Sequence, residues 1–324
     1  MPPDLGVIRR LDQLADDAGV FTMVAADQRE SLRRMLGGTV PDECLTEVKM
    51  DIVAAVGAHA SAILLDPQFA AAQAITTGTL PGSAGLIVSS EDDGYRSVAE
   101  GTPARWLHGW SPELALRLGA TAVKLLVQHT ERSPKLTHLD AQFVAQAAVK
   151  CRELALPLVL EVLVPGADAL EHAERTAVIV AAARALSPYC DIYKAQFPGP
   201  TTDPEGKEAL AACRAMDEAC TAPWVILSSG LTYDRFVLAV ETACRGGASG
   251  FLAGRAIWGD AVSFSGSRRR AALRSEGVSR LERLAQITRA SGVPWRVRRS
   301  GEIAAMPVPA PDWFEGPRFD RDRT

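Results

Sequence analysis

Eight short apolar runs, rich in β-branched residues, recur along the chain and predict eight β-strands. Each run is bounded by polar residues, glycine or proline. The runs cover residues 21–28, 61–66, 85–90, 121–128, 158–164, 191–197, 224–229 and 249–255. Because they are apolar throughout and do not alternate with polar positions, we expect strands that are buried on both faces, as in parallel sheets.

Segments with helical periodicity separate these runs. They predict helices at 43–59, 112–118, 140–154, 167–186, 206–220, 234–245 and 278–291, and the third connection has the least clear pattern. Eight strand–helix repeats predict an α/β protein with a closed (β/α)₈ TIM barrel. A doubly wound nucleotide-binding sheet is disfavoured, since no Gly-x-Gly-x-x-Gly follows the first run and no Walker A sequence occurs.

The length of 324 residues fits a single barrel domain with extensions. We assign the barrel domain to residues 1–300. From residue 301 onward the chain carries Pro307, Pro309, Pro311 and Pro317, followed by a charged end. This composition predicts an extended or mobile Pro-rich C-terminal tail over 301–324.

Composition narrows the class of partner. Thirty-five basic and 39 acidic residues give a net charge of -4, so we expect no nucleic acid or membrane partner, and a small molecule instead. The start of the chain has no signal-peptide pattern and no segment is long enough to span a bilayer, which predicts a cytoplasmic protein. The six cysteines form no C-x-x-C pair, so buried free thiols are expected.

Polar residues recur where the predicted strands end. In a barrel these ends form the mouth that carries the chemistry, above an apolar interior. The residues are Asp27, Asp66, Glu91, Lys124, Glu161, Lys194, Ser228, Ser229 and Arg255. Their repetition over all eight runs predicts an active site at the mouth.

Two of the chain's few lysines, Lys124 and Lys194, lie inside predicted strands. Strand alternation places both in the lumen or both in the dry helix layer, and only the lumen suits a charge. There, burial and a neighbouring ammonium lower an amine's affinity for its proton, and a neutral amine can attack a carbonyl to form an imine. Glu161 and Asp27 would transfer the protons. Which lysine attacks stays open on these grounds.

Two segments predict anion binding. The loops after the seventh and eighth runs contain Gly230, Gly254 and Arg255, a combination typical of phosphate sites in barrels. After the first run, Gln28 and Arg29 are placed to hold a second anionic end of a substrate. The predicted substrate contacts are therefore Gln28, Arg29, Asp66, Ser228, Ser229, Gly230, Gly254 and Arg255.

The chain resembles the class I, Schiff-base aldolases that cleave tagatose 1,6-bisphosphate and, more closely, those that cleave 6-deoxy-6-sulfofructose 1-phosphate. The resemblance rests on AADQRESL (25–32), SAILLDPQF (61–69), AVKLLV (122–127), DIYKAQFP (191–198), PWVILSSG (223–230) and GASGFLAGRAIW (247–258). It covers the whole predicted barrel in consistent order.

The resemblance implies roles for individual residues. Lys194 would form the imine with dihydroxyacetone phosphate, Lys124 would tune charge, and Glu161 and Asp27 would shuttle protons. The C1 phosphate would be held by Ser228, Gly230, Gly254 and Arg255, and the far end of the sugar by Gln28 and Arg29. It also implies no metal, no cofactor and a homo-oligomer.

One position departs from the family pattern. Gln196, two residues after Lys194, replaces a glutamate that relatives commonly carry. The expected reaction is cleavage of 6-deoxy-6-sulfofructose 1-phosphate to dihydroxyacetone phosphate and sulfolactaldehyde. The alternatives are a tagatose-1,6-bisphosphate or fructose-1,6-bisphosphate aldolase and, in another class, a non-catalytic regulator that binds a sugar phosphate. A sulfonate, with one negative charge, would need a less positive far pocket than a phosphate.

Overall fold

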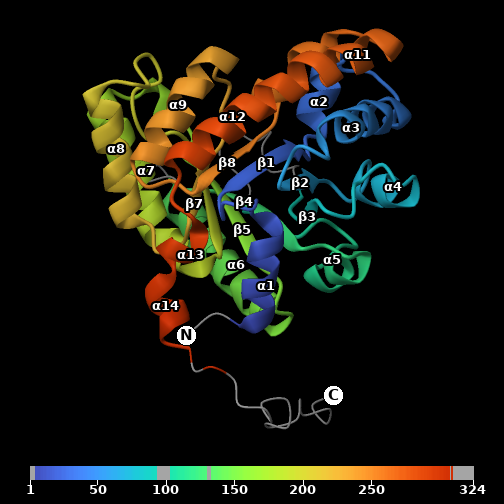
Figure 1. Ribbon diagram of the computed structural model, residues 1–324. Helices are drawn as coiled ribbons and strands as arrows, with labels where there is room; N and C mark the ends of the chain where they lie inside the picture. The colour runs from blue at the N-terminus through green and yellow to red at the C-terminus, as the bar shows by residue number, and fades with distance from the viewer. Residues whose placement is uncertain (1–3, 93–102, 130–132, 307, 309–324) are drawn as a thin grey trace, which may run out of the picture.

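Eight parallel strands close into a barrel in the order β1 to β8, each hydrogen-bonded to the next and β8 to β1 (Figure 1). The computed structural model describes residues 4–92, 103–129, 133–306 and 308. The strands are β1 (Phe21–Ala26), β2 (Ala62–Leu65), β3 (Gly85–Ser89), β4 (Ala122–Gln128), β5 (Leu158–Leu163), β6 (Ile192–Ala195), β7 (Trp224–Ile226) and β8 (Gly250–Ala253). Each lies inside its predicted run, so the predicted TIM barrel and its single domain are confirmed.

Helices surround the barrel. Seven of them match the predicted helices: α3 (Asp42–Val56), α5 (Pro112–Leu118), α6 (Pro134–Glu153), α7 (His172–Leu186), α8 (Lys207–Ala219), α9 (Tyr233–Arg245) and α12 (Val278–Ser291). The short helices α2 (Glu30–Met35), α4 (Ala71–Thr76), α10 (Arg255–Trp258) and α11 (Gly266–Ala272) were not predicted, because so few residues show no clear periodicity. Much of the unclear third connection, 93–102, lies outside the described residues.

The strands separate two apolar cores. One fills the barrel interior with side chains such as Met23, Leu64 and Leu252, while the other lies between the strands and the outer helices. The interior core continues into α1 (Leu5–Leu14), whose apolar face covers the amino ends of the strands, and into Trp295 of α13 (Trp295–Arg298). This end of the barrel is therefore closed, which leaves the carboxyl ends of the strands as the open mouth.

The C-terminal segment differs in part from the prediction. Residues expected to begin an extended tail instead form the short helix α14 (Ser300–Ala304). Arg299 pairs with Glu302 on this helix and with Asp191 at the start of β6, and Ile303 packs against the interior core. These contacts order the helix. The tail beyond it falls at 307 and 309–324, outside the described residues.

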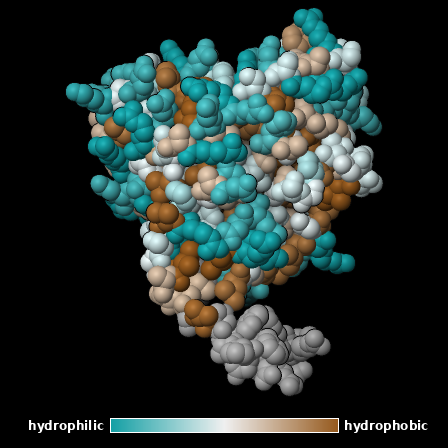
Figure 2. Space-filling view, viewed as in Figure 1, coloured by the Kyte–Doolittle hydropathy of each residue, from teal (hydrophilic) through white to brown (hydrophobic). Residues whose placement is uncertain are grey.

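The outer surface is mostly polar. Figure 2 shows hydrophilic side chains over most of one face, with hydrophobic ones scattered between them and more numerous toward the end where α14 lies. Over the described part of the chain, no helix combines the length and hydrophobicity needed to cross a bilayer.

All six cysteines are free thiols, as expected, but only four of them are buried, and Cys44 and Cys190 are half-buried. Burial raises the pKa of the Cys151, Cys220 and Cys244 thiols to about 12, and it raises the pKa of Cys213 and Cys190 as well. Because the thiolate is the reactive form, these five should react with a thiol reagent at pH 8 only on unfolding. Half-buried Cys44 should react first. Counting modified thiols by mass against time checks this, and rapid modification of all six in the native protein would contradict it.

Candidate active site

A cavity of about 430 Å³ opens at the carboxyl ends of the strands. It brings together residues from β4, β5 and β6 and from the segments that follow β1, β3, β7 and β8. The predicted site residues in its wall are Asp27, Gln28, Arg29, Glu161, Lys194, Ser229, Gly230 and Arg255. Residues separated by more than 200 positions in the chain therefore meet in one pocket at the open mouth.

Both strand lysines point into the barrel. Lys124 lies two residues after Ala122 on β4, and Lys194 lies two residues after Ile192 on β6. Both Ala122 and Ile192 belong to the interior core. Strand alternation then directs the lysine side chains to the same side, at the upper edge of the apolar interior. Glu161 is paired in register with Lys194 on the adjacent strand.

A compact ionic network joins these groups. The Nζ atom of Lys124 lies 3.1 Å from Oδ2 of Asp27, 2.7 Å from Oε1 of Glu91 and 2.9 Å from Oε2 of Glu161. The same Oε2 atom of Glu161 lies 2.9 Å from Nζ of Lys194. One carboxylate oxygen therefore bridges the two ammonium groups, a contact that strand alternation alone did not indicate.

The two lysines differ in access. Lys124 is 0% exposed and is enclosed by three carboxylates, which stabilise its charge in a buried setting. Lys194 is 4% exposed and lines the cavity, beside a carboxylate that can accept a proton. A carbonyl compound in the cavity can therefore reach the nitrogen of Lys194, whereas that of Lys124 is shielded.

Glu91 directly follows the third run; it was expected at the mouth but was given no individual role there. It is 1% exposed, it lines the cavity, and its carboxylate makes the shortest of the three contacts with Lys124. Its position directly after a predicted strand was the feature of the sequence that indicated a place in the cavity wall. What the sequence did not contain was the pairing of Glu91 with Lys124 across neighbouring strands.

The loop after β7 turns sharply at Ser229 and Gly230, with φ values of 41° and 81°. Both residues line the cavity, whereas Ser228, 6% exposed, is not part of its wall. A glycine suits the second position because it adopts positive φ without a steric cost. The turn thus presents backbone and hydroxyl groups to the same cavity that Arg255, the first residue of α10, also lines.

Gly254 lies outside the cavity wall and serves a close approach between the first and last strands. A Cβ atom there would lie 2.5 Å from the carbonyl oxygen of Ala25 and 3.0 Å from Nε2 of Gln28. In the same place, the indole Nε1 of Trp258 donates to the Ala25 oxygen at 2.9 Å. Glycine therefore permits the loop carrying Arg255 to pack directly on β1.

Arg29 also lines the cavity. Its guanidinium donates to Oε1 of Gln68 at 3.1 Å and to the backbone oxygen of Glu91 at 2.8 Å, and the residue is 5% exposed. Ser31 and Arg34 of α2 also line the cavity but were missed in the sequence. Because α2 was not predicted, nothing indicated that Arg34 returns to the mouth.

Asp66, expected among the substrate contacts, has a different place. It is 0% exposed and is not part of the cavity wall. One carboxylate oxygen pairs with Nζ of Lys49, and the other accepts from the backbone N–H groups of Gln68 and Phe69 at 3.1 and 2.7 Å. Burial lowers the pKa of Lys49, and its pairing with Asp66 opposes this shift. The pair fixes the turn after β2.

Breaking this buried pair should destabilise the fold. In Lys49→Met the Asp66 carboxylate stays buried without its cation, so we expect the free energy of unfolding to fall by about 3–5 kcal/mol. The matched control is Lys150→Met, because Lys150 and Glu113 form a pair whose side chains are each 44% exposed. That change should cost less than about 1 kcal/mol. Urea unfolding measures both values, and equal losses would contradict the interpretation.

Gln196, which the resemblance singled out, is 5% exposed. Its Oε1 accepts a hydrogen bond from the backbone N–H of Val164 at 2.7 Å. This neutral amide links the ends of β5 and β6 without adding a negative charge there.

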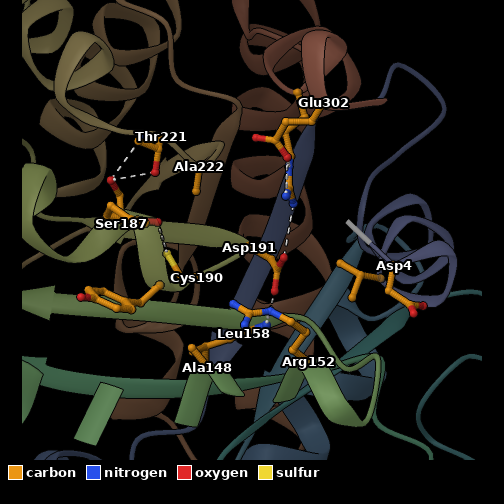
Figure 3. Close-up of a pocket in the computed structure, with 14 residues that line it drawn as sticks. Asp4, Ala148, Arg152, Leu158, Ser187, Cys190, Asp191, Thr221, Ala222 and Glu302 are labelled. Atoms are coloured by element: carbon orange, nitrogen blue, oxygen red, sulfur yellow. Dashed lines mark hydrogen bonds and ion pairs between the residues drawn. The ribbon is translucent and has the colours of Figure 1, made fainter. Parts of the chain in front are cut away.

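A second cavity, of about 420 Å³, lies at the closed end of the barrel (Figure 3). Its central carboxylate, Asp191, accepts from the backbone N–H of Leu158 at 3.0 Å and from Arg299 at 3.3 Å. Arg299 in turn binds Glu302. These charged groups hold α14 on the barrel, so the cavity wall is structural.

Within the described ranges, no group of three His, Cys, Asp or Glu side chains is arranged to hold a metal ion.

Comparison with known proteins agrees with this architecture. The tagatose 1,6-diphosphate aldolase of Streptococcus pneumoniae strain R6 is 26% identical, over 89% of this chain and 97% of its own length. Tagatose 1,6-diphosphate aldolase 1 of Enterococcus faecalis is 27% identical, over 88% and 95%. An archaeal fructose 1,6-bisphosphate aldolase structure superposes with a TM-score of 0.60 at 16% identity, over 88% of this chain and 99% of that one, which supports the fold.

The family model described as DeoC/LacD family aldolase matches residues 21–260, from the first residue of β1 to just beyond α10. This range contains all eight strands and every residue of the cavity wall. The match spans well over half of the chain. The chain therefore belongs to the DeoC/LacD family of class I aldolases and is a carbon–carbon lyase.

Proposed function

We propose that Lys194 forms an imine with the C2 carbonyl of a ketose 1-phosphate, which the enzyme cleaves to dihydroxyacetone phosphate and an aldehyde. The observation that carries this proposal is the difference in access between the two lysines. Lys194 lines the cavity, whereas Lys124 is fully enclosed by three carboxylates. Only a nucleophile that reaches the bound carbonyl can attack it.

In the proposed reaction, the neutral Lys194 amine adds to C2, and the resulting carbinolamine loses water to give a protonated imine. A carboxylate removes the proton of the C4 hydroxyl, the C3–C4 bond breaks, and its electron pair moves to the imine to form an enamine. Glu161, 2.9 Å from Nζ of Lys194, is placed to carry protons at the amine. Protonation of the enamine at C3 and hydrolysis then release dihydroxyacetone phosphate and restore the lysine.

Two positive regions of the cavity wall would hold the two ends of the substrate. Arg255, with Ser229 and Gly230, would bind the C1 phosphate near the ends of β7 and β8. Arg29 and Arg34 would bind an anionic group at C6. Two guanidinium groups suit a phosphate, which is nearly a dianion, better than they suit a sulfonate.

The preferred substrate class is therefore a ketose 1,6-bisphosphate. The relatives from Streptococcus and Enterococcus are named for tagatose 1,6-diphosphate, which also favours this class over the sulfonate expected from the sequence. The value of kcat/KM for tagatose 1,6-bisphosphate, fructose 1,6-bisphosphate and 6-deoxy-6-sulfofructose 1-phosphate separates the candidates. A clear preference for the sulfonate would reverse this order of substrates.

Borohydride trapping tests the chemistry itself. Reduction in the presence of dihydroxyacetone phosphate should attach the three-carbon unit irreversibly to Lys194, as peptide mass mapping would show. A label on Lys124 would reverse the roles of the lysines. Absence of any label, together with absence of cleavage, would refute the aldolase proposal and favour a binding protein without turnover.

A further inference from the structure

We propose that Trp258 is a positioning residue for the subsite that holds the C1 phosphate of the substrate. The proposal rests on the proposed function, in which Arg255 binds that phosphate. Trp258 is 1% exposed and does not line the cavity. It acts through Arg255, which lies three positions earlier on the single turn of α10.

The indole of Trp258 joins α10 to the first strand of the barrel. Strands β1 and β8 are paired in register up to Val24 and Ala253. One residue further along β1, the carbonyl oxygen of Ala25 accepts a hydrogen bond from Nε1 of Trp258 at 2.9 Å. The indole therefore continues the contact between the first and last strands toward the mouth, beyond the last register pair.

Gly254 leaves room for this hydrogen bond. A Cβ atom at position 254 would lie 2.5 Å from the carbonyl oxygen of Ala25 and 3.4 Å from Nε1 of Trp258. The backbone directly before Arg255 thus passes beside both the donor and the acceptor. The hydrogen bond and the start of α10 share one tightly packed place.

The hydrogen bond gives α10 a direction that its apolar packing does not supply. Ala256, Ile257 and Trp258 are all buried in the core between the strands and the outer helices. Burial of apolar surface holds the turn against the barrel but is non-directional. A hydrogen bond to a strand oxygen has a preferred distance and angle. Because α10 has only four residues, fixing its last residue also fixes Arg255, its first.

The acceptor belongs to the strand that leads into the ionic network. Ala25 is part of the interior core and lies two residues before Asp27, whose carboxylate is 3.1 Å from Nζ of Lys124. The indole bond therefore sets where Arg255 stands relative to this network. In the proposed reaction the substrate contacts both places at once, so a small displacement of Arg255 should weaken binding of the phosphate.

The experiment uses the full chain and two matched probes, dihydroxyacetone phosphate and dihydroxyacetone, which differ only in the phosphate. Borohydride trapping is followed by mass over a series of probe concentrations. In Trp258→Phe, which keeps an aromatic ring but removes the donor, we expect the half-saturating concentration of dihydroxyacetone phosphate to rise about tenfold. For dihydroxyacetone it should stay within about twofold, because no phosphate has to reach Arg255.

A second variant covers the case in which Trp258→Phe does not fold. Incorporation of β-(3-benzothienyl)alanine at position 258 keeps the shape of tryptophan and replaces its N–H by sulfur. It should give the same selective loss for the phosphorylated probe.

The matched control is Trp224→Phe, because Trp224 is also fully buried and its Nε1 donates to Oδ1 of Asp217 at 3.0 Å. It should lower the melting temperature without changing the ratio of the two half-saturating concentrations. An unchanged ratio in Trp258→Phe, or an equal change in Trp224→Phe, would overturn the role of Trp258. Equal half-saturating concentrations for both probes in the wild-type enzyme would also overturn it, while the imine chemistry would stand. Absence of trapping with either probe in the wild-type enzyme would instead refute the proposed function.

Discussion

Replacing Lys194 with arginine should lower kcat for ketose bisphosphate cleavage by at least about 10⁴-fold. Arginine keeps a positive charge beside Glu161, but a guanidinium stays protonated and does not form the imine. Borohydride trapping should be lost together with turnover. Steady-state kinetics and the mass of the reduced protein measure the two effects.

The matched control is Lys207→Arg, the same change at an exposed position at the start of α8. It should leave kcat and trapping unchanged. Near-normal cleavage by Lys194→Arg, with a native melting temperature, would eliminate Lys194 as the nucleophile. Transfer of the trapped label to Lys124 in that variant would point to the enclosed lysine instead.

Replacing Glu161 with glutamine should lower kcat by about 10²–10⁴-fold. The carboxylate oxygen of Glu161 lies 2.9 Å from both lysine nitrogens, so an amide of the same size removes the proton carrier and the negative charge that separates two cations. Imine formation should become slower as well, because the amine has lost its nearest proton acceptor. Single-turnover trapping with dihydroxyacetone phosphate resolves this step from cleavage.

Glu153→Gln, at the exposed end of α6, provides the comparison for a neutralised glutamate outside the mouth, and it should keep full activity. The pH profile separates catalysis from structure. If Glu161 carries protons, its ionisation limb should disappear from the kcat profile of Glu161→Gln. An unchanged profile with unchanged kcat would mean that the carboxylate has only a structural role.

The barrel could be predicted from the sequence because its strands are buried on both faces. Continuous apolar runs such as 121–128 mark such strands, and strand alternation correctly directed Lys124 and Lys194 into the interior. These are local properties of the chain. The connecting elements were harder to predict from the sequence. Helices α2 and α4 each have only six residues, which is too few for a helical period to be recognised.

The contacts between strands could not be predicted in the same way. Nothing in the order of residues states that Glu161 lies between two lysines, or that Glu91 meets Lys124, because these contacts depend on register and on the tilt of the barrel. Asp66 was instead predicted to contact the substrate, although it does not line the cavity. It follows a strand as the cavity residues do, but Lys49 on α3, 17 positions earlier, draws its carboxylate into a buried pair.

The closed end of the barrel has a practical consequence for handling the enzyme. Both α1 and α14 pack at the amino ends of the strands, opposite the cavity (Figure 1). A support, tag or fused protein joined beside either helix would be attached on the side away from the substrate entrance. Immobilised in this orientation, the catalyst would keep its entrance facing the bulk solution.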